Sequence, residues 1–214
     1  PIQKELAVMT ARNNNGQMAS FPMVEMSFHP TANLVEYLFC PAEVDAVIEQ
    51  QAKEITENIA NALGITGLLA VEYFLDRDGK LVVNEMAPRP HNSGHHTIEA
   101  NYTSQFEQHL RVLLDLPLGS PDLIMPAVMI NLLGEEGHSG NAVYQGLSEA
   151  LAETGVYPHL YNKKITKPKR KMGHITVTKP SLDEARKCAK MLLENVKVIS
   201  SSKIFENGSH YNGL

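Results

Sequence analysis

The Asp78-Gly79 pair constrains the fold of this 214-residue chain more than any other feature of its sequence. It lies between two runs rich in Val, Leu and aromatic residues, 68–75 and 80–86, which have the length of β-strands. Asp-Gly favours the two-residue turn of a β-hairpin, because both turn positions tolerate a left-handed backbone conformation. The sequence therefore predicts an antiparallel hairpin over residues 68–86.

Two carboxylates face each other in this hairpin. With a two-residue turn, Asp76 faces Leu81 and, further along the strands, Glu72 faces Glu85. Like charges at facing positions repel each other. Three explanations are open: a divalent cation such as Mg²⁺ bridges the pair; the two share a proton as an acid/base pair; or the face is solvated and the repulsion is tolerated.

The segment 87–96 follows the hairpin and concentrates polar side chains. Its two prolines and a glycine exclude a regular helix or a central strand. Arg89 could hold a carboxylate or a phosphate through two hydrogen bonds, or it could form an ion pair with Glu72 or Glu85. Zinc is a further alternative, although no His-Glu-x-x-His pattern supports it among His91, His95, His96 and His109.

Apolar spacing predicts the remaining strands and the turn between the first two. The expected strands are 4–12, 18–28, 34–39, 127–133, 158–161 and 173–178. Asn13-Asn14-Asn15-Gly16 is the turn expected after the first strand.

Helices are predicted from capping residues and from three- and four-residue apolar spacing. Pro41 is expected to open a helix that ends at Gly64 and has an apolar face of Val44, Val47, Ile48, Ile55, Ile59 and Leu63. Capping patterns at Ser104 and Ser181 open two more helices, and 147–152 forms a short one. The Ser104 helix should bury Phe106, Leu110 and Leu113, and the Ser181 helix should bury Leu182, Ala185, Ala189 and Leu192.

Composition limits the class of protein. With 24 acidic and 19 basic residues the net charge is −5, and 43% of the residues are apolar. These values exclude extensive disorder, and no uncharged apolar stretch reaches the roughly 20 residues that span a membrane. The two cysteines, Cys40 and Cys188, have no Cys-x-x-Cys spacing, which fits a reducing compartment such as the cytoplasm.

The run 163–171 is the one dense basic segment in this acidic chain. It is either a solvated charged loop or an anion site. A small phosphorylated substrate fits an anion site better than nucleic acid does, because the chain has no Trp and few aromatic residues lie among the basic ones.

Several motifs resemble one enzyme family. They are Val71-Glu72-Tyr73-Phe74, Asn84-Glu85-Met86-Ala87-Pro88-Arg89-Pro90-His91-Asn92-Ser93-Gly94-His95, Thr103-Ser104-Gln105-Phe106-Glu107-Gln108-His109, Leu116-Pro117-Leu118-Gly119, Val128-Met129-Ile130-Asn131-Leu132-Leu133-Gly134 and Arg170-Lys171-Met172-Gly173-His174. Together they are similar to the ATP-grasp 5-(carboxyamino)imidazole ribonucleotide synthases, also called the ATPase subunit of phosphoribosylaminoimidazole carboxylase. The similarity runs from about Lys4 to Thr178. The motif that begins at Asn84 is highly specific for this family.

The resemblance implies an α+β fold. The C-terminal part of an ATP-grasp domain, an antiparallel sheet with flanking helices, would occupy residues 1–120. A small α/β C-terminal domain that binds the substrate phosphate would occupy 121–200, and a tail 201–214. The segment 117–121 is the expected linker.

The resemblance also implies a reaction and its residues. ATP would phosphorylate bicarbonate to carboxyphosphate, and the amino group of 5-aminoimidazole ribonucleotide would then be carboxylated, in de novo purine synthesis. Glu72 and Glu85 would hold Mg²⁺ or Mn²⁺, and Arg89 would be the catalytic residue that stabilises the carboxyphosphate charge. The nucleotide would contact Glu5, His29, Asn84 and Glu85. The ribonucleotide substrate would contact Arg89, His91, Asn92, Lys163 and Arg170.

The partners expected from the family are ATP, bicarbonate, the ribonucleotide and a second copy of the chain, but neither nucleic acid nor a membrane. Family members also have a preceding domain and a hinge that receives adenine, and this chain has no counterpart of either. We therefore expect the C-terminal portion of a longer protein, inactive alone. The alternative functions are a non-catalytic ribonucleotide-binding module and a zinc hydrolase.

Overall fold

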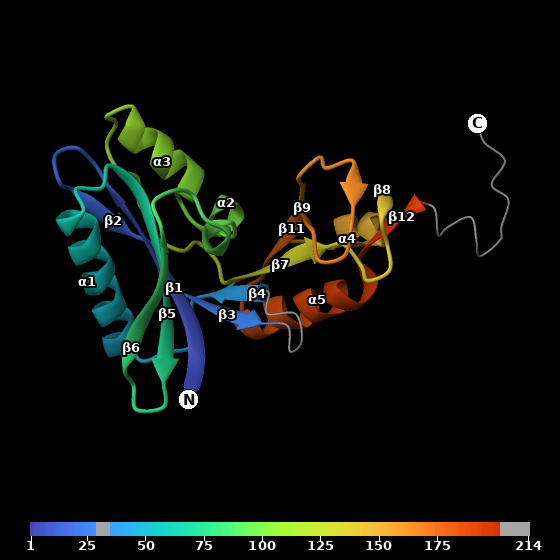
Figure 1. Ribbon diagram of the computed structural model, residues 1–214, viewed down its shortest axis with the longest axis horizontal. Coiled ribbons are helices and arrows are strands. Elements are labelled where there is room, and N and C mark those ends of the chain that lie inside the picture. Colours follow the sequence, from blue (N-terminus) through green and yellow to red (C-terminus); the bar gives the residue numbers. More distant parts are fainter. Residues whose placement is uncertain (29–34, 202–214) are drawn as a thin grey trace, which may run out of the picture.

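A long antiparallel sheet organises the chain (Figure 1). The computed structural model describes residues 1–28 and 35–201. The sheet has the strand order β6-β5-β1-β3-β4-β7-β11-β9, with β2 paired to β1. Its strands are β1 (Ile2–Arg12), β2 (Met18–Ser20), β3 (Val24–Phe28), β4 (Val35–Cys40), β5 (Gly67–Asp76), β6 (Leu81–Ala87), β7 (Ala127–Leu133), β9 (Val156–Leu160) and β11 (Lys171–Thr178). It runs without a break across residue 120, the expected boundary between two domains, because β4 pairs with β7.

Helices cover both faces of this sheet. They are α1 (Ala46–Ala62), α2 (Thr97–Ala100), α3 (Gln105–Leu113), α4 (Leu147–Ala152) and α5 (Leu182–Asn195), with one 3-10 turn, η1 (Asn92–Gly94). The predicted fold class, an antiparallel sheet with flanking helices, is confirmed. No helix in the described part of the chain is both long enough and apolar enough to cross a membrane.

Helix α1 packs on the face of β1 and β5 that carries Leu6, Val8, Val71 and Tyr73. Pro41 does not open this helix, which begins at Ala46. Val47 and Leu63, expected on its apolar face, are 66% and 61% exposed. The other residues predicted for this face, Val44, Ile48, Ile55 and Ile59, do pack against the sheet. The centre of the packed face is Ala52, Thr56 and Ala60, whose small side chains let the helix lie close to the strands.

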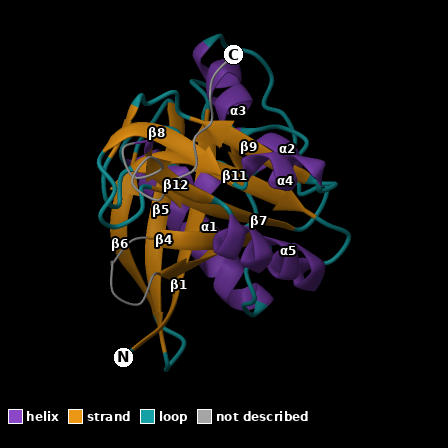
Figure 2. Ribbon diagram, turned by 90° about the vertical axis from the view of Figure 1, so that its right-hand side faces the viewer, coloured by secondary structure: helices purple, strands orange, loops and turns teal. Residues whose placement is uncertain are grey.

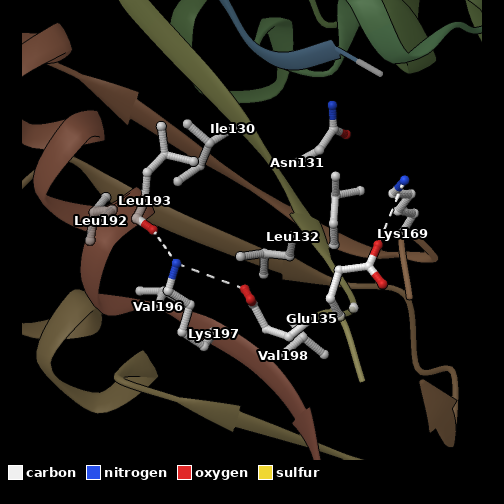
Figure 3. Close-up of a pocket in the computed structure, with 13 residues that line it drawn as sticks. Ile130, Asn131, Leu132, Glu135, Lys169, Leu192, Leu193, Val196, Lys197 and Val198 are labelled. Atoms are coloured by element: carbon white, nitrogen blue, oxygen red, sulfur yellow. Dashed lines mark hydrogen bonds and ion pairs between the residues drawn. The ribbon is translucent and has the colours of Figure 1, made fainter. Parts of the chain in front are cut away.

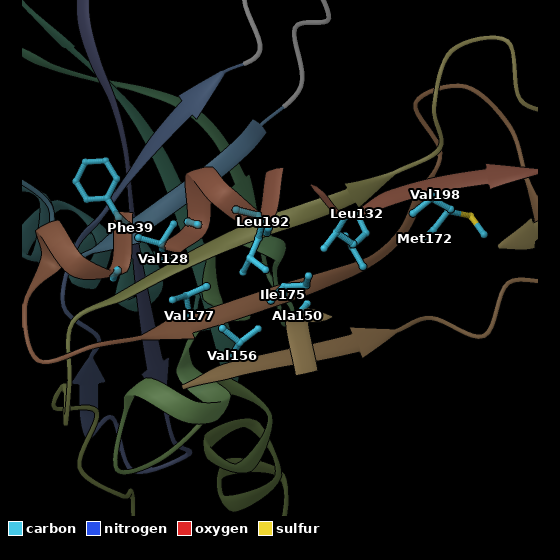
Figure 4. Packing of buried hydrophobic residues seen from close by; sticks show 14 residues of the cluster. Phe39, Val128, Leu132, Ala150, Val156, Met172, Ile175, Val177, Leu192 and Val198 are labelled. Atoms are coloured by element: carbon cyan, nitrogen blue, oxygen red, sulfur yellow. The ribbon is translucent and has the colours of Figure 1, made fainter. Parts of the chain in front are cut away.

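Helix α5 packs on the C-terminal strands and closes the largest apolar cluster (Figure 4). Val128, Ile175 and Val177 of the sheet meet Ala185, Ala189 and Leu192 of the helix, as the spacing after Ser181 predicts. Figure 2 shows α5 beside β7. The sequence did not indicate the small second sheet, β10-β8-β12, formed by Ile165–Thr166, Gly140–Gln145 and Lys197–Ser200.

Two predicted elements differ in detail from the structure. The strand expected over 18–28 is divided into β2 and β3, with Phe21, Pro22 and Met23 between them, because proline cannot donate a ladder hydrogen bond. Helix α3 begins where predicted, since the Ser104 hydroxyl accepts a hydrogen bond from the Glu107 amide. Its orientation is the reverse of the prediction: Phe106, Leu110 and Leu113 are 40%, 56% and 58% exposed, whereas Gln105, Gln108 and Val112 are buried.

The β5–β6 hairpin has a three-residue turn rather than the predicted two-residue turn. The Asp76 amide donates to the Lys80 carbonyl, and Gly79 adopts a left-handed conformation with φ of 78°. Leu81 consequently faces Leu75 and not Asp76. A bulge between Val83 and Glu85 then restores the predicted register, so Glu72 does face Glu85.

A buried hydroxyl joins α1 to the sheet and gives a stability test. The Tyr73 hydroxyl is 2.7 Å from Thr56 Oγ1 and donates to the Ala52 carbonyl at 3.1 Å, and burial raises the pKa of Tyr73 to about 12. We expect Tyr73→Phe to lower the free energy of unfolding by about 1–2 kcal/mol, because it leaves Thr56 short of a partner in the core. Urea denaturation measures this loss.

The matched control is Tyr102→Phe, which removes a hydroxyl from a residue that is 68% exposed. It should change stability by less than about 0.5 kcal/mol. Equal losses in the two variants would contradict the role given to the Tyr73 hydroxyl.

Candidate active site

One face of the sheet gathers three carboxylates from three neighbouring strands. Glu72 on β5 faces Glu85 on β6 and Ala7 on β1, and side chains at facing positions point to the same side of a sheet. Glu5 lies two positions from Ala7 on β1 and therefore shares this face. The bulge on β6 is essential for the arrangement. Strict alternation from Leu81, which packs toward α1, would place Glu85 on the α1 side.

The His91 ring lies between the two facing carboxylates. Its Nδ1 is 3.6 Å from Glu72 Oε1, and its Nε2 is 3.9 Å from Glu85 Oε1. These distances are too long for hydrogen bonds. One donor atom from each residue lies within 4.8 Å of the others, and no other described set of three or more His, Cys, Asp or Glu side chains comes together in this way.

Electrostatics make the carboxylate pair unfavourable on its own. The Glu72 side chain is only 12% exposed. Burial, with the charges of Glu85 and Glu5, raises the pKa of Glu72 to about 7. Burial also lowers the pKa of His91, and the nearby Arg89 charge acts in the same direction. His91 is therefore a neutral imidazole, and it does not offset the repulsion between the Glu72 and Glu85 carboxylates.

Gln105 of α3 fixes the position of His91. Its side-chain amide accepts a hydrogen bond from the His91 amide and donates to the His91 carbonyl, both at 2.8 Å. The Gln105 Nε2 also lies 2.9 Å from His95 Nδ1. Gln105 is completely buried. The loop that carries the site is thus held through its backbone by the N-terminus of α3.

The loop after β6 crosses this face of the sheet and reaches the C-terminal strands. Asn92 exchanges side-chain hydrogen bonds with Asn131 of β7 at 3.0 and 3.3 Å, and Lys171 Nζ donates to Asn92 Oδ1 at 3.1 Å. Glu99 of α2 is 2.7 Å from His159 Nε2 on β9. The N-terminal and C-terminal halves of the chain therefore meet at the loop 87–96, which carries the predicted substrate residues His91 and Asn92.

The other histidines of the loop do not form a zinc site with His91. The His95 ring stacks on His174 at 4.7 Å, and His174 stacks on His159 at 4.6 Å. Burial lowers the pKa of His95 to about 4 and that of His174 to about 3, so these rings are neutral. His96 is buried. The stacked rings join the two halves of the chain, and the zinc alternative has no geometric support among the described residues.

The remaining predicted residues differ in their surroundings. Arg89 is exposed, donates to the Pro90 carbonyl and has no carboxylate partner in the described part of the chain. Asn84 is the extra residue of the β6 bulge. Lys163 Nζ donates to the Lys171 carbonyl at 2.6 Å, and Arg170 donates to the Ile165 carbonyl. His29 lies outside the described residues.

A separate cavity of about 280 Å³ opens on the other side of β7, between α5 and β12 (Figure 3). Leu132, Leu192 and Val198 line it, and Lys197 at its edge is 3.8 Å from Glu135. It contains none of the predicted site residues.

Two family models match the chain. A model of the ATP-grasp domain matches residues 1–106, and a model of the phosphoribosylaminoimidazole carboxylase C-terminal domain matches residues 127–188. This chain belongs to the ATP-grasp family of N5-carboxyaminoimidazole ribonucleotide synthases. Membership confirms the resemblance that the Asn84–His95 motif indicates.

Individual relatives support the same conclusion. The N5-carboxyaminoimidazole ribonucleotide synthase of Bacillus subtilis is 44% identical over 183 residues, which cover 86% of this chain and 46% of the relative. The crystal structure of N5-carboxyaminoimidazole ribonucleotide synthetase from Thermotoga maritima has a TM-score of 0.86 and 48% identity, over 94% of this chain and 53% of that one.

A third relative was solved with ligands. It is the synthase of Aspergillus clavatus, in complex with ADP and 5-aminoimidazole ribonucleotide, with a TM-score of 0.80 and 33% identity over 91% of this chain and 52% of that one. The chain thus spans about half the length of the relatives it matches.

Sequence reasoning missed three residues of this centre: Gln105, Asn131 and Lys171. Each lies within a motif that resembles the family, so the residue types were visible. What the sequence did not indicate is their contacts. Gln105 lies in a helix whose predicted buried face was Phe106, Leu110 and Leu113, and Asn131 lies in a strand predicted from its apolar residues.

The raised pKa of Glu72 gives a pH test. The folded chain keeps the Glu72 proton up to about pH 7, whereas the unfolded chain releases it near pH 4.5. The stability that this proton contributes is present below pH 4.5 and lost as the pH rises through 7. Relative to Glu72→Gln, the wild type should therefore lose about 2–3 kcal/mol of unfolding free energy between pH 5 and pH 8 without divalent cations.

Chemical denaturation of the two proteins across this pH range measures the difference. Titrating groups remote from Glu72 cancel because both proteins contain them in the same surroundings. Glu149→Gln, at an exposed position of α4, is the control and should show a flat difference from the wild type. A flat difference for Glu72→Gln as well would show that the Glu72 carboxyl is not perturbed.

Proposed function

We propose that this chain contains the catalytic centre of a cytoplasmic N5-carboxyaminoimidazole ribonucleotide synthase. The observation that carries the proposal is the Glu72–Glu85 pair on one sheet face, with His91 between the two carboxylates. The reaction is the ATP-dependent carboxylation of 5-aminoimidazole ribonucleotide by bicarbonate, through carboxyphosphate, with ADP and phosphate as the other products. The proposed division of labour is residues 1–120 for ATP-grasp chemistry and 121–200 for substrate phosphate.

The donor set fits a hard divalent cation. Two carboxylates are typical ligands of Mg²⁺ at phosphate sites, and the nearby His91 nitrogen also suits Mn²⁺. Glu72 and Glu85 would hold the cation, which when bound neutralises phosphate charge during phosphoryl transfer. This role would explain why two facing carboxylates, one of them almost buried, are retained despite their mutual repulsion.

The exposed residues beside the pair suit the anionic reactants. Arg89 has no carboxylate partner among the described residues, so its guanidinium is available to stabilise bicarbonate and the charge of carboxyphosphate. Glu5 and Asn84 lie on the strands that flank the pair and would contact the nucleotide, as would His29. His91 and Asn92 would line the aminoimidazole.

The basic segment suits the phosphate of the ribonucleotide. The Lys163 ammonium donates to the Lys171 carbonyl, and the Lys171 ammonium donates to Asn92 in the loop 87–96. We propose that Lys163 and Arg170 bind the 5′-phosphate. A guanidinium and an ammonium are the side chains that bind phosphate best.

The proposal predicts the effect of Glu85→Gln in the full-length protein. Wild type should release ADP only when ATP, bicarbonate, 5-aminoimidazole ribonucleotide and Mg²⁺ are all present. Glu85→Gln should lower kcat by at least about 100-fold, because it removes one carboxylate from the cation. A coupled assay of ADP release measures both.

The control is Glu149→Gln, which should keep wild-type activity because its position is exposed and remote. The alternative function, a non-catalytic ribonucleotide-binding module, would appear as ribonucleotide binding without ADP release in the wild-type protein. Metal analysis of the same sample distinguishes a zinc hydrolase.

We also propose that the protein is a homodimer through α3. This helix buries Gln105 and Gln108. The helix and the segments next to it expose a group of apolar side chains: Tyr102, Phe106, Leu110, Leu113, Leu114 and Leu116. Gathered apolar surface of this kind is typical of protein interfaces. Figure 1 shows α3 at the periphery, away from the C-terminal strands.

Leu110→Asp tests the dimer. A charge within this apolar group should convert the full-length protein from dimer to monomer, because a buried unpaired carboxylate opposes association. Sedimentation velocity measures the change. Leu151→Asp, at a 61% exposed position of α4, is the control and should remain dimeric. A monomeric wild type would contradict the proposal.

A further inference from the structure

Lys171 has no assigned role, yet its side chain reaches the centre of the site. Its Nζ donates to Asn92 Oδ1 at 3.1 Å. Burial lowers the pKa of Lys171, while the charges of Glu72 and Glu85 oppose that effect. The ammonium is therefore partly removed from water and lies within the field of both carboxylates.

A bulge in β11 places Lys171 on this face. Gly173 faces Leu132 and Lys171 faces Leu133, so Met172 is the extra residue. Met172 is buried in the apolar cluster under α5. Strict alternation from His174, which lies on the site face, would direct Lys171 toward that same cluster. The bulge buries Met172 and leaves Lys171 free to reach Asn92.

A third group contacts the Asn92 amide. Asn92 and Asn131 exchange two hydrogen bonds, a pairing that is kept if both amides are rotated together by 180°. An ammonium only donates hydrogen bonds. By donating to Asn92 Oδ1, Lys171 favours the arrangement in which the Asn92 carbonyl oxygen, and not its NH₂ group, faces the ammonium.

The same residue connects the basic segment to the carboxylate pair. Lys163 donates to the carbonyl of Lys171, whose side chain holds Asn92, the neighbour of His91. Lys171 thus links Lys163, a proposed phosphate-binding residue, to the proposed aminoimidazole site through one hydrogen bond at its carbonyl and one at its ammonium.

We propose that Lys171 is the positioning residue for Asn92, and that it orients the Asn92 amide for the heterocyclic base of the ribonucleotide. This inference rests on the proposed function, because it takes Asn92 as a substrate contact. Lys171 itself acts through Asn92 and not on the reacting atoms.

The test uses the full-length protein and steady-state kinetics. Lys171→Met should raise KM for 5-aminoimidazole ribonucleotide by about 10- to 100-fold, the usual cost of losing a charged hydrogen bond, and change KM for ATP by less than about threefold. Lys171→Arg should restore the ribonucleotide KM to within about fivefold of wild type, since a guanidinium can also donate to Asn92. A purely structural role would change both KM values or lower the melting temperature.

Lys187→Met is the matched control. It removes the same charge at an exposed position of α5, outside the basic segment, and it should leave both KM values within about twofold of wild type. Melting curves check that each variant folds. Should Lys171→Met not fold, Lys171→Leu, which also has no hydrogen-bond donor, replaces it with the same expected result.

A double-mutant cycle tests whether Lys171 acts through Asn92. The variant Lys171→Met/Asn92→Ala should have the ribonucleotide KM of Asn92→Ala alone, because the group that Lys171 positions is already absent. Additive increases in KM would overturn the inference. So would a Lys171→Met enzyme that matches wild type.

These outcomes separate the two proposals. Inactivity of the wild-type full-length protein with all substrates present would refute the proposed function. An active wild type with an unchanged Lys171→Met variant would refute only the role of Lys171.

Discussion

The repulsion between Glu72 and Glu85 is the constraint around which the rest of the structure is arranged. Two carboxylates on facing positions of neighbouring strands, one of them almost buried, are unfavourable without a positive charge. The chain supplies no ammonium or guanidinium in direct contact with them among its described residues. It places the neutral ring of His91 between them, held through its backbone by Gln105. The described residues therefore leave the negative charge of the two carboxylates without a positive partner in direct contact, and a divalent cation would balance it.

A β-bulge determines the direction of a functional side chain in each half of the sheet. A bulge at Asn84 turns Glu85 away from α1 and toward Glu72, and a bulge at Met172 turns Lys171 toward Asn92. In each case the bulge changes which face the functional side chain occupies, while its neighbours keep their places in the apolar clusters. Because the main sheet is continuous, both residues then lie on one face, and the loop after β6 crosses that face to join them.

Helix α3 shows how a site loop and an outer surface can be linked. Its polar residues point inward because the loops they hold have backbone groups that need partners: Gln105 pairs with His91, and Gln108 pairs with Gly119 in both directions. Its apolar residues are consequently left outside. The usual relation between hydrophobic pattern and burial fails here because two glutamines form hydrogen bonds in the interior, and the apolar side chains then lie on the outer face of the helix.

The sequence by itself determined most strands of the main sheet, the capped helices, the family and the pairing of Glu72 with Glu85. These depend on local preferences, on periodicity and on an uninterrupted motif. The turn was wrong by one residue, and the correct pairing survived only because the Asn84 bulge compensated. Tertiary structure alone decided the inverted burial of α3, the stacking of His95 on His174 and the contact of Lys171 with Asn92. Those features join residues far apart in the chain, and they depend on bulges and on backbone hydrogen-bond partners that no local pattern specifies.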